Sequence, residues 1–399
     1  MKKAAQFIHI YIIATLLLVF STCLNAQKNS FIPYGIKSAE AQYKKAVSEY
    51  TDYHKFPRST KPDGSLYSVK SPDWCSGFFP GSLWLLYDLT KDVFYKDAAK
   101  KWSVGLVKEQ FNKTTHDLGF MMYVPFGIGY KLTNDSNYKK IIIQSAKSLA
   151  TRFHPHAGVI RSWDFGPWQY PVIIDNMMNL ELLFEASKLS GDDTYRQVAI
   201  KHADHDMQNH FRKDYSSYHV VDYDSTTGVA IKKQTNQGFA DESAWARGQA
   251  WGLYGFTVMY RYTKDKKYLN QAENIAAFIL NHPNLPKDKV PYWDFNDPKI
   301  PDTYRDASAA AIIASALLEL KNYVGKEKAK YYFKTAETIL TTLTTPEYIA
   351  ENGNCNFVLK HCVGNWPKGK ATGEIDAAIN YGDYYYLEAL LRYKQANGK

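Results

Sequence analysis

The feature that most constrains the fold is a helical hairpin pattern that recurs along the 399-residue chain. In each copy an apolar segment ends at a short polar turn, and a tyrosine follows a few residues into the next segment. Recurring units of this kind indicate a repeat architecture built from one supersecondary element. The turns begin at Lys91-Asp92, Asn134-Asp135, Gly191-Asp192, Lys264-Asp265 and Gly325-Lys326.

The two members of each hairpin differ in character. The first member, as in residues 307–320, is apolar or small on nearly all faces, and a helix of that kind is buried. The second member, as in residues 268–280 and 330–343, is amphipathic and carries Lys and Glu, so one side faces water. Buried helices that alternate with half-exposed helices indicate an inner ring and an outer ring.

About twelve helices follow from this periodicity, and six inner plus six outer helices make an all-α (α/α)6 barrel. An open helical solenoid is the alternative, but the repeats are irregular in length and the loops are rich in aromatic and acidic residues. The expected helices cover residues 36–51, 76–90, 95–111, 119–132, 137–153, 175–189, 193–211, 245–262, 266–281, 306–324, 328–344 and 379–395.

The N-terminus is typical of a secretory signal peptide over residues 1–26. A basic head, the apolar run 8–20 and the small-residue exit Leu24-Asn25-Ala26 follow one another. An uncleaved anchor is the alternative, and a lipid anchor at Cys23 is disfavoured because Phe20-Ser21-Thr22-Cys23 is a poor lipidation motif. We therefore expect a periplasmic or secreted protein without a membrane span. No linker divides residues 27–399, so one domain is predicted.

The net charge and the cysteine content limit the ligands and metals that the protein is expected to bind. The net charge of +9 suits an anionic partner, but the basic residues are scattered and no nucleic-acid motif is present. An acidic carbohydrate fits equally well. Cleavage would leave Cys75, Cys355 and Cys362; Cys355 and Cys362 could pair across a short loop and leave Cys75 free. None of the three has metal-ligand spacing, so no metal is expected.

Aromatic and glycine-rich stretches precede several inner helices, at residues 74–81, 161–168 and 292–295. In a barrel these helix starts converge on one face. Aromatic rings such as Trp74 and Trp163 can stack on the apolar faces of sugars, although a single tryptophan could equally anchor a loop. Their repeated placement at inner-helix starts favours a carbohydrate cleft.

Two aspartates lie at inner-helix starts: Asp117 in residues 116–120 and Asp175 in residues 172–180. Each could serve as a helix N-cap, which Asp fills well. Asp175, however, follows three β-branched residues in a long apolar run, where burial disfavours the ionised carboxylate. A carboxyl with a raised pKa is what a general acid needs, and two carboxyls at one face could make the pair used in glycoside hydrolysis.

A third segment, residues 237–252, is also rich in charged and aromatic residues, and in it Arg247 stands between two tryptophans. An arginine in an apolar helix must be paired or must meet an anion, and its planar fork matches a carboxylate. The alternative to binding an anionic substrate is that Arg247 forms a structural salt bridge with Asp241 or Glu242. His219 could polarise a substrate or cap a loop.

Four stretches together resemble the unsaturated glucuronyl hydrolase family, glycoside hydrolase family 88. The resemblance implies an (α/α)6 barrel without a metal or cofactor, acting on the 4,5-unsaturated uronic acid that polysaccharide lyases leave at a non-reducing end. The stretches are 73–84, 116–120, 173–180 and 245–252, in family order, and the last two are long and specific.

The same resemblance implies the site. Asp175 would protonate C4 of the vinyl ether and then activate water for C5, with Asp117 as the assisting carboxylate. One departure from the family is Cys75, where a small hydroxyl residue is usual. The residues that would bind the uronyl group are Trp74, His116, Trp163, His219, Gln237, Arg247 and Trp251.

Three other functions stay open on sequence alone. An unsaturated rhamnogalacturonyl hydrolase would share the chemistry on pectin fragments, and a non-catalytic protein could bind glycans. A sugar epimerase on the same barrel would need histidine pairs where these helix starts carry Asp. The favoured substrate is a glycosaminoglycan-type unsaturated oligosaccharide, and the expected state is a monomer or weak homodimer.

Overall fold

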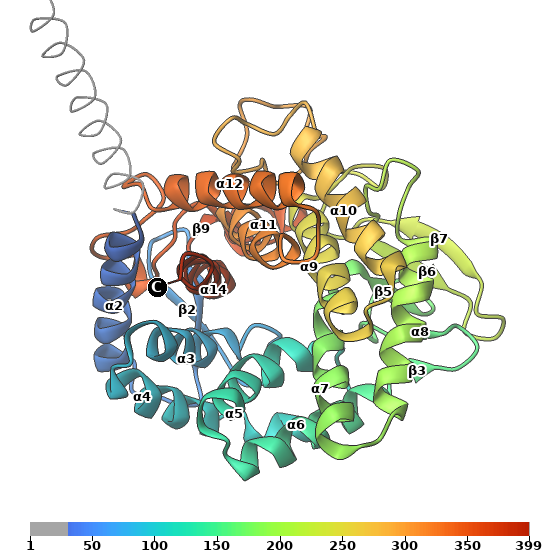
Figure 1. The fold of residues 1–399 in the computed structure, drawn as a ribbon, viewed down its shortest axis with the longest axis horizontal. Helices are drawn as coiled ribbons and strands as arrows, with labels where there is room; N and C mark the ends of the chain where they lie inside the picture. Colours follow the sequence, from blue (N-terminus) through green and yellow to red (C-terminus); the bar gives the residue numbers. More distant parts are fainter. Residues whose placement is uncertain (1–30, 399) are drawn as a thin grey trace, which may run out of the picture.

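The computed structural model describes residues 31–398 and forms two concentric rings of helices (Figure 1). The predicted signal peptide and Cys23 lie outside the described residues. The outer ring comprises α2 (Phe31–Glu49), α4 (Val93–Val104), α6 (Ser136–Ala150), α8 (Thr194–Asn209), α10 (Lys266–Asn281) and α12 (Lys326–Leu343). The inner ring comprises α3 (Phe78–Thr90), η2 (Gly119–Gly127) continued by α5 (Ile128–Thr133), α7 (Leu180–Ser190), α9 (Ala246–Thr263), α11 (Ala307–Leu320) and α14 (Asn380–Ala396).

The inner ring is closed. Each inner helix packs on the next in chain order, and α14 returns to pack on α3. Helix α11 shows why these helices lie inside, since every residue from Ala307 to Leu320 is buried. The predicted all-α (α/α)6 barrel is therefore confirmed, and the open solenoid is excluded because its ends would not meet.

The recurring turn has a structural explanation. The inner helix ends on a left-handed residue, which is Lys91, Asn134 or Lys264 in three of the hairpins. The aspartate that follows caps the outer helix, as Asp92 does by accepting a hydrogen bond from the Phe94 backbone N–H. An aspartate N-cap of this kind contributes about 1 kcal/mol. The tyrosine of the pattern then points into the core, where Tyr95 is fully buried.

Within residues 31–398, short strands interrupt the loops between helices and make four small antiparallel sheets. The three-stranded sheet β5-β6-β7 matters most, because β5 ends just before the turn that carries Asp175. The strands are β1 (Phe56–Thr60), β2 (Leu66–Val69), β3 (Phe153–His154), β4 (Val159–Ile160), β5 (Pro171–Ile173), β6 (Val220–Tyr223), β7 (Ala230–Gln234), β8 (Cys362–Val363) and β9 (Ile375–Ala377). Short helical segments are η1 (Val107–Phe111), η3 (Ile174–Asn179), η4 (Asn354–Asn356), η5 (Trp366–Lys368) and α13 (Gly369–Thr372).

Two inner helices begin irregularly. The expected helix 119–132 starts as the π-helix η2, where Pro125 supplies no N–H, and the expected helix 175–189 starts with the 3-10 turn η3. The two starts touch, because the Phe120 N–H donates to Asn179 Oδ1. A Cβ on Gly119 would lie 2.6 Å from the Asn179 Cα, so only glycine fits this contact.

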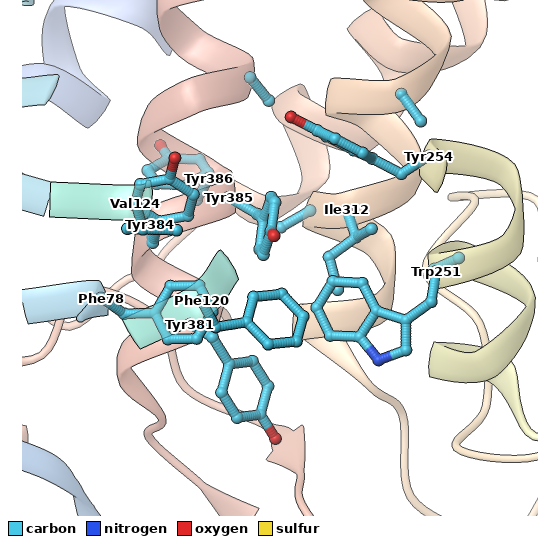
Figure 2. Close-up of a cluster of buried hydrophobic side chains, with 14 of the residues drawn as sticks. Phe78, Phe120, Val124, Trp251, Tyr254, Ile312, Tyr381, Tyr384, Tyr385 and Tyr386 are labelled. Atoms are coloured by element: carbon cyan, nitrogen blue, oxygen red, sulfur yellow. The ribbon is translucent and has the colours of Figure 1, made fainter. Parts of the chain in front are cut away.

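An aromatic layer fills the inside of the ring. Figure 2 shows Phe78, Phe120, Trp251 and Tyr381 packed together with Ile312, and the first two rings lie 5.3 Å apart. The layer lies between the two ends of the barrel. The inner helices begin at one end, called the N-terminal face, and end at the other, called the C-terminal face.

Two other expectations concern cysteines and membranes. The pairing of Cys355 with Cys362 is not found: both are free thiols, and the Cys355 Sγ donates to the Gly64 carbonyl oxygen. Cys75 is free and buried. Between residues 31 and 398, no helix combines the length and hydrophobicity that crossing a membrane requires.

Candidate active site

A cavity of about 350 Å³ opens at the N-terminal face. Its walls come from the starts of inner helices and from the loops before them. The lining residues are Arg58, Trp74, Thr114, Thr115, His116, Asp117, Ser162, Trp163, Phe165, Ile173, Asp175, Asn236, Gln237, Arg247, Gly364, Asn365, Lys368, Glu374 and Tyr381.

Asp175 projects from the 3-10 turn η3, which follows strand β5 directly. It does not cap a helix, because the residue before η3 is Ile173 and makes no side-chain cap. The Asp175 side chain is 10% exposed between the buried residues Ile174 and Met177. Burial raises the pKa of Asp175 to about 6, against the opposing charge of Arg247. An appreciable fraction of this carboxyl is therefore protonated near neutral pH.

Asp117 lines the same cavity from the turn before η2. Its Oδ2 accepts a hydrogen bond from the Thr115 hydroxyl at 2.8 Å, and its Oδ1 lies 3.2 Å from His116 Nε2. Burial raises the pKa of Asp117 to about 7, with a further contribution from the Asp175 carboxyl and against the Thr115 hydrogen bond. The structure thus brings both predicted carboxyls to one cavity, and no side-chain hydrogen bond caps η2.

His219 links the Asp175 carboxyl to a loop. Its Nδ1 accepts the backbone N–H groups of Asn236 and Gln237, each at 3.0 Å, so the ring proton lies on Nε2. That Nε2 lies 3.7 Å from Asp175 Oδ2. Burial lowers the pKa of His219 to about 3, and Arg247 adds to the effect. A neutral histidine therefore faces the carboxyl and holds the loop that carries Gln237.

Arg247 has a different ionic partner from those expected. The carboxylate that it pairs with is Asp306, at 3.7 Å, whereas Glu242 pairs with Arg212 at 3.1 Å. The alternative salt bridges to Asp241 or Glu242 are therefore wrong. The arginine is nearly fully buried, so its charge needs the partners that the barrel provides around it.

Hydrogen bonds complete the surroundings of Arg247. The guanidinium donates to the carbonyl oxygens of Val363 and Gly364, and to Gln237 Oε1 at 2.6 Å. Together with Asp306 at the start of α11, these partners come from three separate parts of the chain. One guanidinium thus fixes helix α11, strand β8 and the Gln237 loop around the cavity.

The aromatic residues divide into two groups. Trp74 and Trp163 line the cavity, and the Phe165 ring stacks on Trp163 at 5.1 Å with an interplanar angle of 16°. His219 and Trp251 are buried behind the wall rather than on it. Trp251 belongs to the aromatic layer, and its indole N–H lowers the pKa of Asp175. Trp251 therefore acts on the carboxyl from behind the wall.

Arg58 and Tyr381 are among the cavity residues that sequence reasoning missed. Arg58 on β1 pairs with Asp73 at 2.8 Å and with Glu374 at 2.6 Å, and so clamps the loop before β9 to the rim. Nothing in the sequence around Arg58 distinguishes it. Tyr381, in the first turn of α14, could have been found by the same rule as the aspartates, since it stands at an inner-helix start.

Carboxyls that are partly protonated near neutral pH, set among rings that can stack on sugars, meet the requirements of acid-catalysed cleavage of a sugar linkage. The fold and site together define the class: a glycoside hydrolase on an (α/α)6 barrel. The family model for Glycosyl Hydrolase Family 88 matches residues 43–395, so the chain belongs to this family, as its sequence motifs indicated.

Related proteins are similar to this chain, in sequence and in structure, over nearly its whole length. An unsaturated glucuronyl hydrolase of Formosa agariphila is 49% identical over 374 residues, which are 92% of each protein. The crystal structure of an unsaturated glucuronyl hydrolase specific for heparin is 48% identical, with a TM-score of 0.90 over 93% of this chain and 99% of that one. A mutant of the Streptococcus agalactiae enzyme, complexed with dGlcA-GalNAc6S, is 31% identical with a TM-score of 0.77 over 91% and 92% of the two chains.

Proposed function

We propose that this hydrolase removes the 4,5-unsaturated uronic acid from the non-reducing end of lyase-generated oligosaccharides by hydrating its double bond. The observation that carries the proposal is Asp175, a buried carboxyl with a pKa raised to about 6 in the wall of a sugar-sized cavity. Proton transfer to carbon is slow unless the acid is positioned and protonated, and this site supplies both conditions.

The reaction follows from the positions of the two carboxyls. Asp175 donates its proton to C4, which forms a C–H bond and leaves positive charge shared between C5 and the ring oxygen. The Asp175 carboxylate then takes a proton from water as the water oxygen bonds to C5. Asp117, which interacts with Asp175 electrostatically, stabilises the developing cation when Asp117 is in its ionised form. The resulting hemiketal opens to the ketone and releases the rest of the oligosaccharide as an alcohol.

The N-terminal face also suits the uronate carboxylate. The inner helices begin there, and helix N-terminal ends carry partial positive charge. Gln237 and Arg247 stand at the same wall, with Gln237 held by the Arg247 guanidinium. We assign the uronyl subsite to Trp74, His116, Trp163, Gln237 and Arg247, with His219 and Trp251 acting through Asp175.

A glycosaminoglycan fragment is the substrate class that fits best. Relatives are described as specific for heparin, as unsaturated chondroitin disaccharide hydrolases, and as bound to dGlcA-GalNAc6S. Arg58, Asn365 and Lys368 line the cavity, and we assign to them the sugar after the uronate. The net charge of +9, which becomes about +7 when Lys2 and Lys3 are removed with the signal peptide, would steer such anionic fragments to the protein.

Export and assembly state are part of the proposal. The basic head, the apolar run 8–20 and the small-residue exit support cleavage after Ala26 and a periplasmic or secreted enzyme. N-terminal sequencing of the mature protein tests this. A monomer or weak homodimer is expected, and sedimentation at several concentrations tests it.

The decisive experiment uses D₂O. Hydration must place a solvent-derived deuterium at C4 of the released 4-deoxy-5-keto uronate, because Asp175 exchanges its proton with solvent. Delivery from one fixed carboxyl places the label on one face before keto–enol exchange scrambles it. Early-time NMR of the product reads both features. A product without deuterium at C4 excludes hydration.

A separate experiment decides the substrate class: a panel of unsaturated glycosaminoglycan and pectin disaccharides is tested as substrates, and cleavage is followed by loss of ultraviolet absorbance.

A further inference from the structure

A second cavity, of about 570 Å³, opens at the C-terminal face. It lies on the other side of the aromatic layer from the active site: Tyr381 lines the first cavity, and Phe120, Tyr254, Tyr384 and Tyr385 line the second (Figure 2). Nothing in the proposed reaction uses it. Its volume is within the range of small-molecule sites.

The buried part of this cavity has more carboxylates than cations. Arg261 lies 3.0 Å from Glu181 and 3.2 Å from Glu319, and Arg392 lies 3.1 Å from Glu319 and 3.5 Å from Glu388. These three carboxylates are 9–17% exposed.

Glu185 adds a fourth carboxylate, 15% exposed, which accepts from the Tyr262 hydroxyl. Lys188, which lies 3.5 Å from it, is 72% exposed and lines the cavity together with Lys131 and Asp88. Three of these carboxylates, Glu181, Glu185 and Glu388, line the cavity, whereas Glu319 contacts the two guanidinium groups without lining it. Four carboxylates therefore surround two guanidinium groups.

Helix direction adds to this negative field. The inner helices end at this face, and the C-terminal end of a helix carries about half a negative charge. Glu319 stands in the last turn of α11, where the helix dipole favours a cation instead. The field at this site is opposite in sign to that at the N-terminal face, where helix N-terminal ends favour an anion.

Two tyrosine hydroxyls point to a ligand independently of the charges. Tyr384 and Tyr385 line the cavity and are 5% and 2% exposed. Within residues 31–398 the structure gives neither hydroxyl a hydrogen-bond partner, whereas the Tyr254 hydroxyl donates to Glu388 at 3.0 Å. A hydroxyl can accept from an N–H group, and the tyrosine ring faces attract a cation.

We propose that this C-terminal cavity binds a small organic diamine in its ammonium form. The carboxylates left over by the two arginines would pair with its charges, the two tyrosine hydroxyls would accept its N–H groups, and the rings would cover its methylene chain. A bare metal ion fits less well, since no group of three His, Cys, Asp or Glu side chains in residues 31–398 has a metal-binding arrangement.

The probe is 1,4-diaminobutane, with 1,4-butanediol as its neutral match and calcium chloride and sodium chloride at equal ionic strength as salt controls. Calorimetry and thermal melting of the full chain should show saturable binding and a rise in Tm for the diamine alone. The same binding should persist in Asp175→Asn, because the site is separate from the catalytic one.

Variants locate the binding. Glu181→Gln should weaken diamine binding about tenfold by removing one ionic partner, and Tyr385→Phe should weaken it by removing one hydroxyl. Glu273→Gln is the matched control, since Glu273 pairs with Lys328 between outer helices and does not line the cavity. An equal response to butanediol or salt, a stronger response to calcium, or unchanged binding in both cavity variants would overturn the proposal. If Glu181→Gln fails to fold, the Tyr385→Phe result decides.

Discussion

Carboxyl groups are buried at both faces of the barrel, but their surroundings differ. At the C-terminal face Glu319 lies within 3.2 Å of both Arg261 and Arg392. Burial alone would raise its pKa, but the two guanidinium groups outweigh burial and lower the pKa of Glu319. At the N-terminal face Asp175 has a neutral histidine as its neighbour, and burial raises the pKa of Asp175 to about 6. Between these two carboxyls, the presence of two guanidinium groups in direct contact with Glu319, rather than a difference in burial, decides the direction of the pKa shift.

The arginine whose charge reaches Asp175 shows how this difference is maintained. Arg247 could have ionised the aspartate fully, but its guanidinium is occupied by Asp306, Gln237 and the carbonyl oxygens of strand β8 and the residue after it. Its charge still lowers the pKa of Asp175, which limits the rise caused by burial. The pKa of the Asp175 carboxyl is thereby kept in the range in which a proposed general acid can both give and take a proton.

The largest effect expected is on turnover. Asp175→Asn should reduce kcat by more than the about 10²–10⁴-fold that loss of a general acid-base costs, because one residue serves both proton transfers. The amide can neither donate nor accept the proton, while its shape is retained. Turnover is measured on an unsaturated disaccharide, with circular dichroism to verify the fold.

Asp383→Asn is the matched control for that variant. Asp383 is buried in inner helix α14 and burial raises its pKa to about 7, but it accepts backbone N–H groups from Val358 and Leu359 and does not line the cavity. It should keep kcat within a few-fold, but it should lose stability, because an amide can accept only one of the two backbone hydrogen bonds that the Asp383 oxygens accept. Near-normal turnover in Asp175→Asn, or an equal loss in both variants, would contradict the assignment of the acid.

The second prediction uses pH to compare stability at the two faces. The pKa of Asp175 is about 6 in the folded chain, against an ordinary value of 3.8 for an aspartate. The folded state therefore binds more protons between these two values, and stability falls as pH rises through them. Asp175→Asn removes that penalty. It should raise the free energy of unfolding at pH 8 by about 1–3 kcal/mol and change it little at pH 4.

Glu319→Gln should behave in the opposite way. Its lowered pKa contributes stability above the unfolded value of 4.5, and this stability is lost as pH falls through the folded pKa. The variant should therefore lose about 3 kcal/mol at pH 8 and less at pH 3, because a buried ion pair is broken only where Glu319 is charged. Denaturant unfolding at each pH measures both variants. The same sign for both at pH 8 would remove the contrast between the faces.

The third prediction concerns Arg247→Lys, which keeps the charge and removes the fork. A lysine cannot hold Gln237, strand β8 and Asp306 together, so the cavity wall should loosen. We expect KM to rise about tenfold with a smaller change in kcat, which is the pattern of lost substrate binding. A collapse of Tm with unchanged KM in the folded fraction would assign Arg247 a purely structural role.

How far sequence reasoning reached depends on whether a contact is local. The barrel followed from helix periodicity, since each hairpin repeats the same turn, as at Lys91-Asp92. Asp117 and Asp175 were found because each stands at a helix start, and parallel inner helices bring their starts to one face. Both the recurring turn and the helix starts can be recognised from a few neighbouring residues.

Long-range pairing could not be found in this way. Arg247 was expected to pair with neighbours five or six positions away, but it contacts Val363 and Gly364, more than a hundred residues later. Arg58 likewise forms an ion pair with Glu374, a distant residue in the sequence, only because the ring of helices closes. The buried position of Trp251 also required the closed ring, because packing against Phe120 and Tyr385 is what removes it from the cavity wall.

The smallest effect expected is at the rim, where the contrast between the faces is weakest because solvent reaches both. Phe165 is 65% exposed and stacks on Trp163 beside the catalytic cavity. An exposed ring contributes little to folding, so Phe165→Ala should leave Tm within about one degree. If the ring is a platform for the sugar after the uronate, its loss should raise KM about threefold, as expected for an aromatic contact of about 0.5–1 kcal/mol. Phe239→Ala, which removes a 47% exposed ring outside the cavity, is the control and should leave KM unchanged. Steady-state kinetics on a disaccharide and on a longer fragment measure the effect. A fall in kcat with unchanged KM would instead mean that Phe165 acts on Trp163 and, through it, on the uronyl subsite.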